Sequence, residues 1–108
     1  MKKFSHILTI ILLLVAASGK GYAQDGIAAI QNAAEQGDAN AQVDLASRYA
    51  EGVGVTKDLV QAHMWLNIAA SQGKESAIRM HDETAKRMTP AQIAKSDEMA
   101  RQWKLGRP

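Results

Sequence analysis

The sequence predicts an all-α protein, an α-solenoid in which antiparallel helices stack as repeated pairs. A nine-residue stretch that begins at Ala33 recurs 36 residues later at Ala69, with five of the nine positions identical. A period of about 20–50 residues is typical of a stacked repeat array. In addition, apolar residues recur at helical spacing through residues 24–108, and the alternation typical of a strand is missing there.

Two helices are expected in the first part of this region. A short helix over about residues 26–36 ends at Gly37, because glycine readily takes the left-handed conformation of a helix stop. The next helix covers residues 39–50 and places apolar residues four apart on one face. The two glycines within residues 51–55 then break it.

Three further helices are expected. The third starts at Asp58, whose carboxylate can accept hydrogen bonds from free amides of the first turn, and it ends at Gly73. A fourth covers about residues 74–88. The last covers about residues 90–104 and follows a strong start signal at residues 89–92, Thr-Pro-Ala-Gln. In this signal Thr caps the helix, Pro takes its first position and Gln completes a capping box.

Residues 1–23 have the pattern of a secretory signal peptide. Two lysines precede an apolar run over residues 7–17, and small residues occupy the −3 and −1 positions of a cleavage site after Ala23. The apolar run is about half the length that crosses a bilayer as a stable helix. We therefore expect cleavage after Ala23, a repeat domain over residues 24–108, and a periplasmic or secreted protein without stable membrane insertion.

Cleavage would also change the charge. The whole chain has 13 basic and 11 acidic residues, a formal net charge of +2, and loss of three lysines with the signal peptide leaves −1. Because no stripe of Lys and Arg remains, we expect no nucleic-acid partner. The chain has no cysteine, which excludes disulfides, a thiol nucleophile and Cys-bound metals. The sequence indicates no cofactor and no metal.

A set of spaced residues between positions 33 and 77 carries a family pattern. Its members are Leu45, Tyr49, Gly52, Gly54, Asp58, Ala62, Trp65, Ala69, Ala70, Gly73 and Ala77. Together they resemble the Sel1-like repeat (SLR) family, which is related to the tetratricopeptide (TPR) repeats. The resemblance implies antiparallel helix pairs that stack into a superhelix, and a role in protein–protein interaction.

The resemblance gives one good repeat and one degenerate repeat. The good copy covers about residues 37–72, and the degenerate copy begins at residue 73. Residues 90–104 are similar to the terminal capping helix of small family members. In the degenerate copy the positions equivalent to Leu45, Tyr49 and Gly52 hold His81, Ala85 and Met88.

The expected function is that of an exported, non-enzymatic adaptor or binding module in the bacterial cell envelope. Its partner would be another, unidentified protein. The exposed side of the helix at residues 39–50 is the candidate partner-binding face, with Gln42, Asp44, Arg48 and Glu51. Self-association through terminal helix faces is a further possibility, because repeat arrays usually need about three or more repeats to bury their apolar faces.

An enzyme is the alternative interpretation. Residues 71–74 fit the S-x-x-K pattern of penicillin-interacting serine enzymes, which would make the protein a small β-lactamase-like hydrolase using Ser71 and Lys74. That chemistry needs a serine activated by a nearby lysine and an oxyanion hole. The sequence has no Lys-Thr-Gly motif to accompany this pair.

The remaining side chains of chemical interest are expected in the core or at helix interfaces. Tyr49, Trp65 and Trp103 lie at helical spacing with Ala and Leu, which is typical of core residues. His63 and His81 are expected to be surface or interface residues. Because side chains next to one another in a helix diverge by about 100°, His81 and its acidic sequence neighbours do not converge on a metal.

Overall fold

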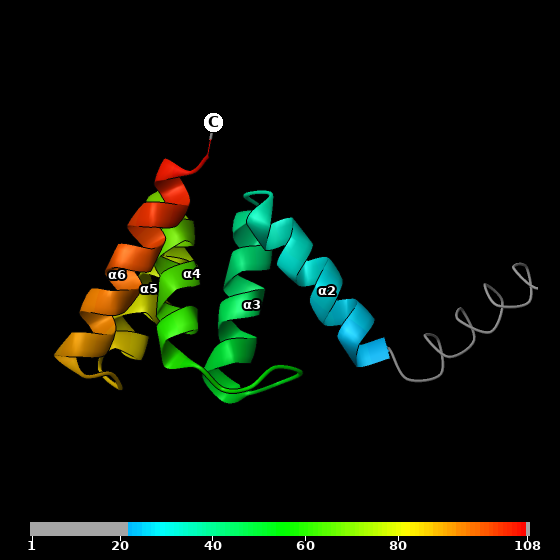
Figure 1. Ribbon diagram of the computed structural model, residues 1–108, viewed down its shortest axis with the longest axis horizontal. Helices are drawn as coiled ribbons and strands as arrows, with labels where there is room; N and C mark the ends of the chain where they lie inside the picture. Colours follow the sequence, from blue (N-terminus) through cyan, green and yellow to red (C-terminus); the bar gives the residue numbers. More distant parts are fainter. Residues whose placement is uncertain (1–21, 108) are drawn as a thin grey trace, which may run out of the picture.

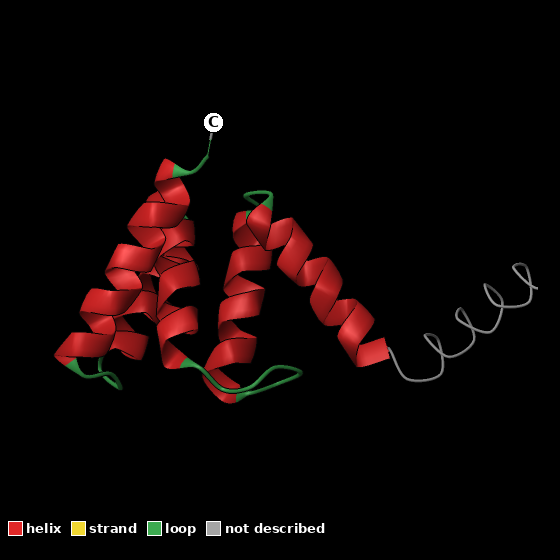
Figure 2. Cartoon of the chain, viewed as in Figure 1, coloured by secondary structure: helices red, strands yellow, loops and turns green. Residues whose placement is uncertain are grey.

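A computed structural model describes residues 22–107, and within them the chain forms helices and no strand (Figures 1 and 2). The helices are α2 (Tyr22–Glu35), α3 (Ala39–Glu51), α4 (Leu59–Ser71), α5 (Glu75–Ala85) and α6 (Pro90–Leu105). They pack as sequential antiparallel pairs, which confirms the predicted all-α fold. The predicted signal peptide stays a prediction, since residues 1–21 lie outside the described part of the chain.

Glycines and side-chain caps end and start the helices where the sequence predicted. Gly52 follows α3 with a φ of 73°, in the left-handed region. Asp58 caps α4, and its carboxylate accepts the N–H of Gln61 at 3.1 Å. At the start of α6 the Thr89 hydroxyl accepts the N–H of Gln92 at 3.1 Å, while the Gln92 side chain accepts the N–H of Thr89 at 2.9 Å.

Two helix boundaries differ from the prediction. α2 begins at Tyr22, so Gly26 lies inside the helix and does not start it. α5 ends at Ala85, before the predicted residue 88. The reason is Pro90, which disfavours helical backbone at the residue before it. Thr89 is extended, with φ −79° and ψ 158°, and a short turn must lead into it.

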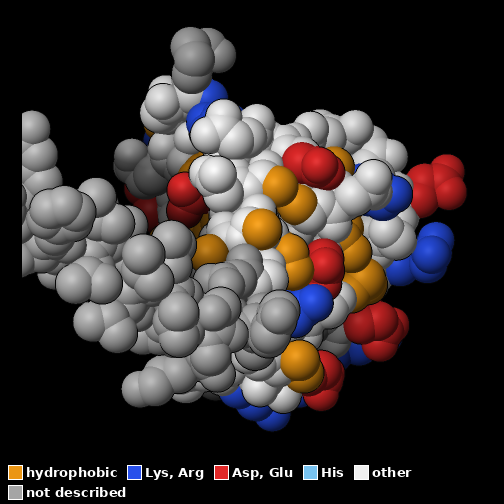
Figure 3. Space-filling model, turned by 90° about the vertical axis from the view of Figure 1, so that its right-hand side faces the viewer, with side chains coloured by type: hydrophobic (Ala, Val, Ile, Leu, Met, Phe, Trp, Pro, Cys, Tyr) orange, Lys and Arg blue, Asp and Glu red, His pale blue; other side chains and the backbone are white. Residues whose placement is uncertain are grey.

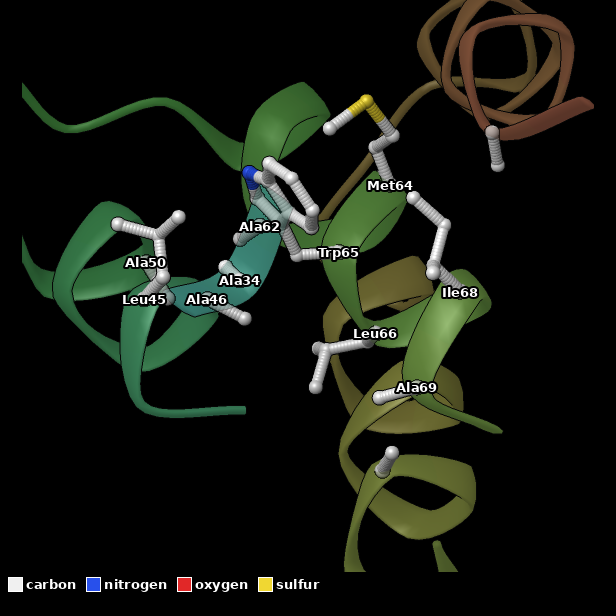
Figure 4. Packing of buried hydrophobic residues seen from close by; sticks show 12 residues of the cluster. Ala34, Leu45, Ala46, Ala50, Ala62, Met64, Trp65, Leu66, Ile68 and Ala69 are labelled. Carbon is white, nitrogen blue, oxygen red and sulfur yellow. The ribbon is translucent and has the colours of Figure 1, made fainter. Parts of the chain in front are cut away.

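The central helix is α4, which packs against α3, α5 and α6. More than half of its residues are buried: Ala62, His63, Met64, Trp65, Leu66, Ile68 and Ala69. In Figure 4, Trp65 lies in the middle of the core, with Leu45, Ala46 and Ala50 of α3 to one side and Met64 and Ile68 to the other. α2 packs against α3, and α6 packs along α4, so α4 holds the two halves of the stack together.

The loop between α3 and α4 closes against α2 at Gly54. This glycine has a φ of 78°, and a Cβ at its position would lie 2.9 Å from Cγ1 of Ile27. Ile27 is buried. Only a residue without a side chain fits both the backbone conformation and the space.

Candidate functional site

A shallow groove lies between α3 and α5, which both pack against α4. Its volume is about 400 Å³, and it is lined by Ser47, Ala50, Glu51, Met80, Glu83, Thr84, Lys86 and Arg87. Ala50 and Thr84 are buried and Met80 packs against the core, so they form the floor. The charged residues are exposed and form the rim. The groove therefore offers an apolar floor between charges of both signs.

Ion pairs at the rim are exposed and exchangeable. Arg87 lies 3.5 Å from the carboxylate of Glu51 and connects the two sides of the groove, while Lys86 pairs with Glu83 at 3.0 Å. Exposed pairs of this kind contribute little to stability, about 0–1 kcal/mol. A partner's charged groups can replace them at small cost. The face shown in Figure 3 likewise mixes acidic, basic and hydrophobic side chains.

The predicted partner-binding residues of α3 divide into three groups. Glu51 lines the groove. Asp44 and Arg48 instead bind each other, with Arg48 Nε 3.0 Å from Asp44 Oδ1, away from the groove lining. The placement of Gln42 on the exposed side was wrong.

Gln42 is fully buried. Its Nε2 donates to the carbonyl oxygen of Ala34 at 3.0 Å, and its Oε1 accepts Nε2 of Gln72 at 2.9 Å. Gln42 lies one helical turn before the buried Leu45 and Ala46, on the core face of α3. A polar residue type indicated exposure, but these two hydrogen bonds satisfy its amide inside the protein. Gln42 therefore links the ends of α2 and α4.

The pair predicted for serine chemistry is not assembled. Ser71 Oγ donates to the carbonyl oxygen of Ile68 at 2.6 Å, in its own helix. Lys74 is the residue that precedes α5, and among the residues that the structure describes no hydrogen bond joins it to Ser71. The geometry does not supply Ser71 with the base that a serine nucleophile needs.

Three residues that sequence reasoning kept apart come together at the junction of α4, α5 and α6. The imidazoles of His63 and His81 stack with ring centroids 4.1 Å apart, and Nδ1 of His63 lies 3.9 Å from the Asp97 carboxylate. Burial in the core, helped by the neighbouring His81, lowers the pKa of His63 below its usual value of 6.5. The histidines lie at a helix interface, as expected. The acid that lies near them is Asp97 of α6, not an acid next to His81 in the sequence.

The sequence has a distant relative among known proteins. The chain is similar to the alginate biosynthesis protein AlgK of Azotobacter vinelandii, with 28% identity over 81 residues. The alignment covers 75% of this chain and 18% of AlgK, so the chain spans less than a fifth of that protein's length. No protein-family model matches the chain. Within residues 22–107, none of the helices is both long enough and apolar enough to span a membrane.

Proposed function

We propose that this protein is an exported, non-enzymatic member of the Sel1-like repeat family that binds another protein through the groove between α3 and α5. The observation that carries the proposal is the groove itself, with Ala50 and Met80 below a rim of both charge signs. Helical-repeat proteins use extended concave surfaces for binding, and α3 and α5 occupy equivalent positions in the 36-residue repeat. A peptide segment with an apolar side chain flanked by charged residues fits this groove.

Three observations support the cellular setting. The signal-peptide pattern of residues 1–23 supports export to the periplasm or beyond. The spaced residues of the SLR pattern support a role in protein–protein interaction. The similarity to the alginate biosynthesis protein AlgK supports a role in polysaccharide biosynthesis.

Self-association is the alternative, in which the partner is a second copy of the same chain. α2 is the terminal helix of the described stack and packs against α3. A second copy could cover the remaining faces of α2. Light scattering over a concentration series separates the two cases. A protein that is monomeric at every concentration does not self-associate, so its partner must be a different protein.

The groove is tested by charge reversal with a matched control. Arg87→Glu places a second acid opposite Glu51 at the rim, whereas Lys95→Glu makes the same charge change on an exposed position of α6. Both variants and the wild type are used to capture proteins from envelope extract. We expect the same proteins to be retained by the wild type and Lys95→Glu and lost from Arg87→Glu. Equal retention by all three would show that the groove is not the binding surface.

A further inference from the structure

Three potential metal ligands converge from three different helices. His63 lies on α4, His81 on α5 and Asp97 on α6. One donor atom of each lies within 4.8 Å of the others. These ligands come from residues far apart in the sequence, so their proximity is a product of the fold.

The two histidines have unused hydrogen-bonding capacity in a buried place. The side chain of His63 is 1% exposed, and its Nε2 has no hydrogen-bond partner among the described residues. Nε2 of His81 is also buried without a partner in that part of the chain. A buried ring nitrogen without a partner costs folding free energy, so each such atom in a native structure requires an explanation. A bound ion would supply the partner for both.

The repeat register makes His81 unusual. Thirty-six residues earlier, the equivalent position holds Leu45, which is buried in the core between α3 and α4. In the degenerate repeat the equivalent position on α5 holds the partly exposed imidazole of His81, which lies against the imidazole of His63. Departures from local packing rules of this kind are expected mainly at functional or strained sites.

Polar neighbours already orient the ligands. Ser96 Oγ lies 2.7 Å from Nδ1 of His63, and Nδ2 of Asn67 donates to Asp97 Oδ1 at 3.1 Å. A proton on Nδ1, shared with Ser96, leaves the lone pair of Nε2 free. Metal-bound histidines usually hold their second ring nitrogen in such a hydrogen bond, and metal-bound carboxylates are hydrogen-bonded in the same way.

We propose that His63, His81 and Asp97 bind a divalent transition-metal ion of the zinc class and thereby fasten α5 and α6 to α4. Two imidazoles and a carboxylate are a ligand set that Zn²⁺ accepts, with a fourth position left for water or a partner's side chain. This site goes beyond the proposed groove function and does not depend on it.

To bind the metal, the three ligand atoms need to move only a short distance toward one another. With metal–ligand bonds of about 2.0 Å, the ligand atoms of a tetrahedral zinc lie roughly 3.3 Å apart. His81 and Asp97 can move closer by side-chain rotation, because their side chains are 28% and 52% exposed. His63 stays fixed in the core. A pocket of about 300 Å³ lies on the His81 side of the cluster and is lined in part by Asn67, Ile78 and His81.

The test is a zinc titration of the tag-free, chelator-treated protein by isothermal calorimetry. We expect one ion per chain and a rise in the thermal midpoint. His81→Gln and Asp97→Asn change partly exposed side chains, so both variants should fold, and each should weaken binding by more than about 100-fold. Glu75→Gln removes an exposed acid on α5 and should leave the affinity unchanged.

A second readout identifies the ligands directly. Nuclear magnetic resonance of the imidazole nitrogens should show that zinc shifts a ring nitrogen of both His63 and His81. The absence of binding at millimolar zinc would overturn the proposal. So would an affinity that is equal in the wild type, His81→Gln and Asp97→Asn, or one that is lost in Glu75→Gln, because these results indicate nonspecific binding to surface acids.

Discussion

The indole of Trp65 meets the indole of Trp103 edge to face, with ring centroids 5.8 Å apart and an interplanar angle of 73°. Trp65 belongs to the central helix and Trp103 to α6. The guanidinium of Arg107 lies over the Trp103 ring, 4.3 Å from its centroid. Edge-to-face aromatic pairs add about 0.5–1.5 kcal/mol beyond area burial. Through this contact α6 is fixed to α4, the helix against which α5 also packs.

Trp65→Ala should largely unfold the protein. Removal of a buried tryptophan costs about 3–5 kcal/mol, which is comparable with the whole stability of a domain of this size. The check is a circular-dichroism melt of the variant and the wild type. Trp103 is only half-buried, so Trp103→Ala should cost less. An unchanged melting midpoint in Trp65→Ala would contradict the central position of this side chain.

Gly54→Ala and Gly26→Ala should change stability in opposite directions. At Gly54 the left-handed backbone costs an alanine about 1–2 kcal/mol, and its Cβ would also meet Ile27. At Gly26, inside α2, a Cβ meets nothing within 4 Å, so alanine should stabilise by about 0.5–1 kcal/mol. Urea unfolding of both variants measures the difference. A stabilising change at Gly54 would show that the loop is not held against α2 as described, and a destabilising change at Gly26 would contradict its open position inside the helix.

Gln42→Leu should destabilise the fold by about 1–3 kcal/mol, because Gln72 and the carbonyl of Ala34 lose their buried partner. Arg48→Ala breaks an exposed ion pair on the same helix and should change stability by less than about 1 kcal/mol. Chemical denaturation of the two variants ranks them. A larger loss in Arg48→Ala than in Gln42→Leu would contradict the buried position of Gln42.

Acid should destabilise the metal-free protein through His63. The groups that face this imidazole are His81 and Asp82 of α5 and Asp97 of α6. Burial lowers the folded-state pKa below 6.5, so the unfolded chain binds the proton at a higher pH than the folded chain. The contribution of His63 to the free energy of unfolding is therefore complete above pH 6.5, and it decreases as the pH falls below 6.5.

Nuclear magnetic resonance titration in the presence of a chelator follows the His63 ring directly. Denaturant unfolding at two pH values, one above and one below 6.5, gives the corresponding change in stability. A measured pKa of His63 at or above 6.5 in the folded protein would contradict the described burial.

Most of the fold could be predicted from the sequence because the signals that start and end a helix act over a few neighbouring residues. Gly52, Asp58 and Thr89 act within a few residues of themselves, and their roles depend on backbone conformation and short hydrogen bonds. Trp65 was also predictable, since a large aromatic residue at helical spacing with alanines has few places other than a core. The 36-residue repeat then fixed the order in which the helices stack.

The sites were less predictable because they depend on how the helices pack. α4 is buried on nearly all sides, so its pattern did not show which residues meet α5 or α6. The contact between His63 and Ser96 joins residues 33 positions apart. A clue to the histidine cluster was the imidazole at the position equivalent to Leu45. Nothing in the sequence indicated that Gln42 is buried, because its amide finds its hydrogen-bond partners on α2 and just after α4.

The proposed function depends on the binding of a partner protein in the groove between α3 and α5. The most direct test places one photo-crosslinking amino acid at Glu51, on the groove, or at Asp44, an exposed acid elsewhere on the same helix. After irradiation in envelope extract, we expect a discrete crosslinked partner from position 51 and none from position 44. A partner crosslinked from position 44 alone, or equally from both positions, would contradict the claim.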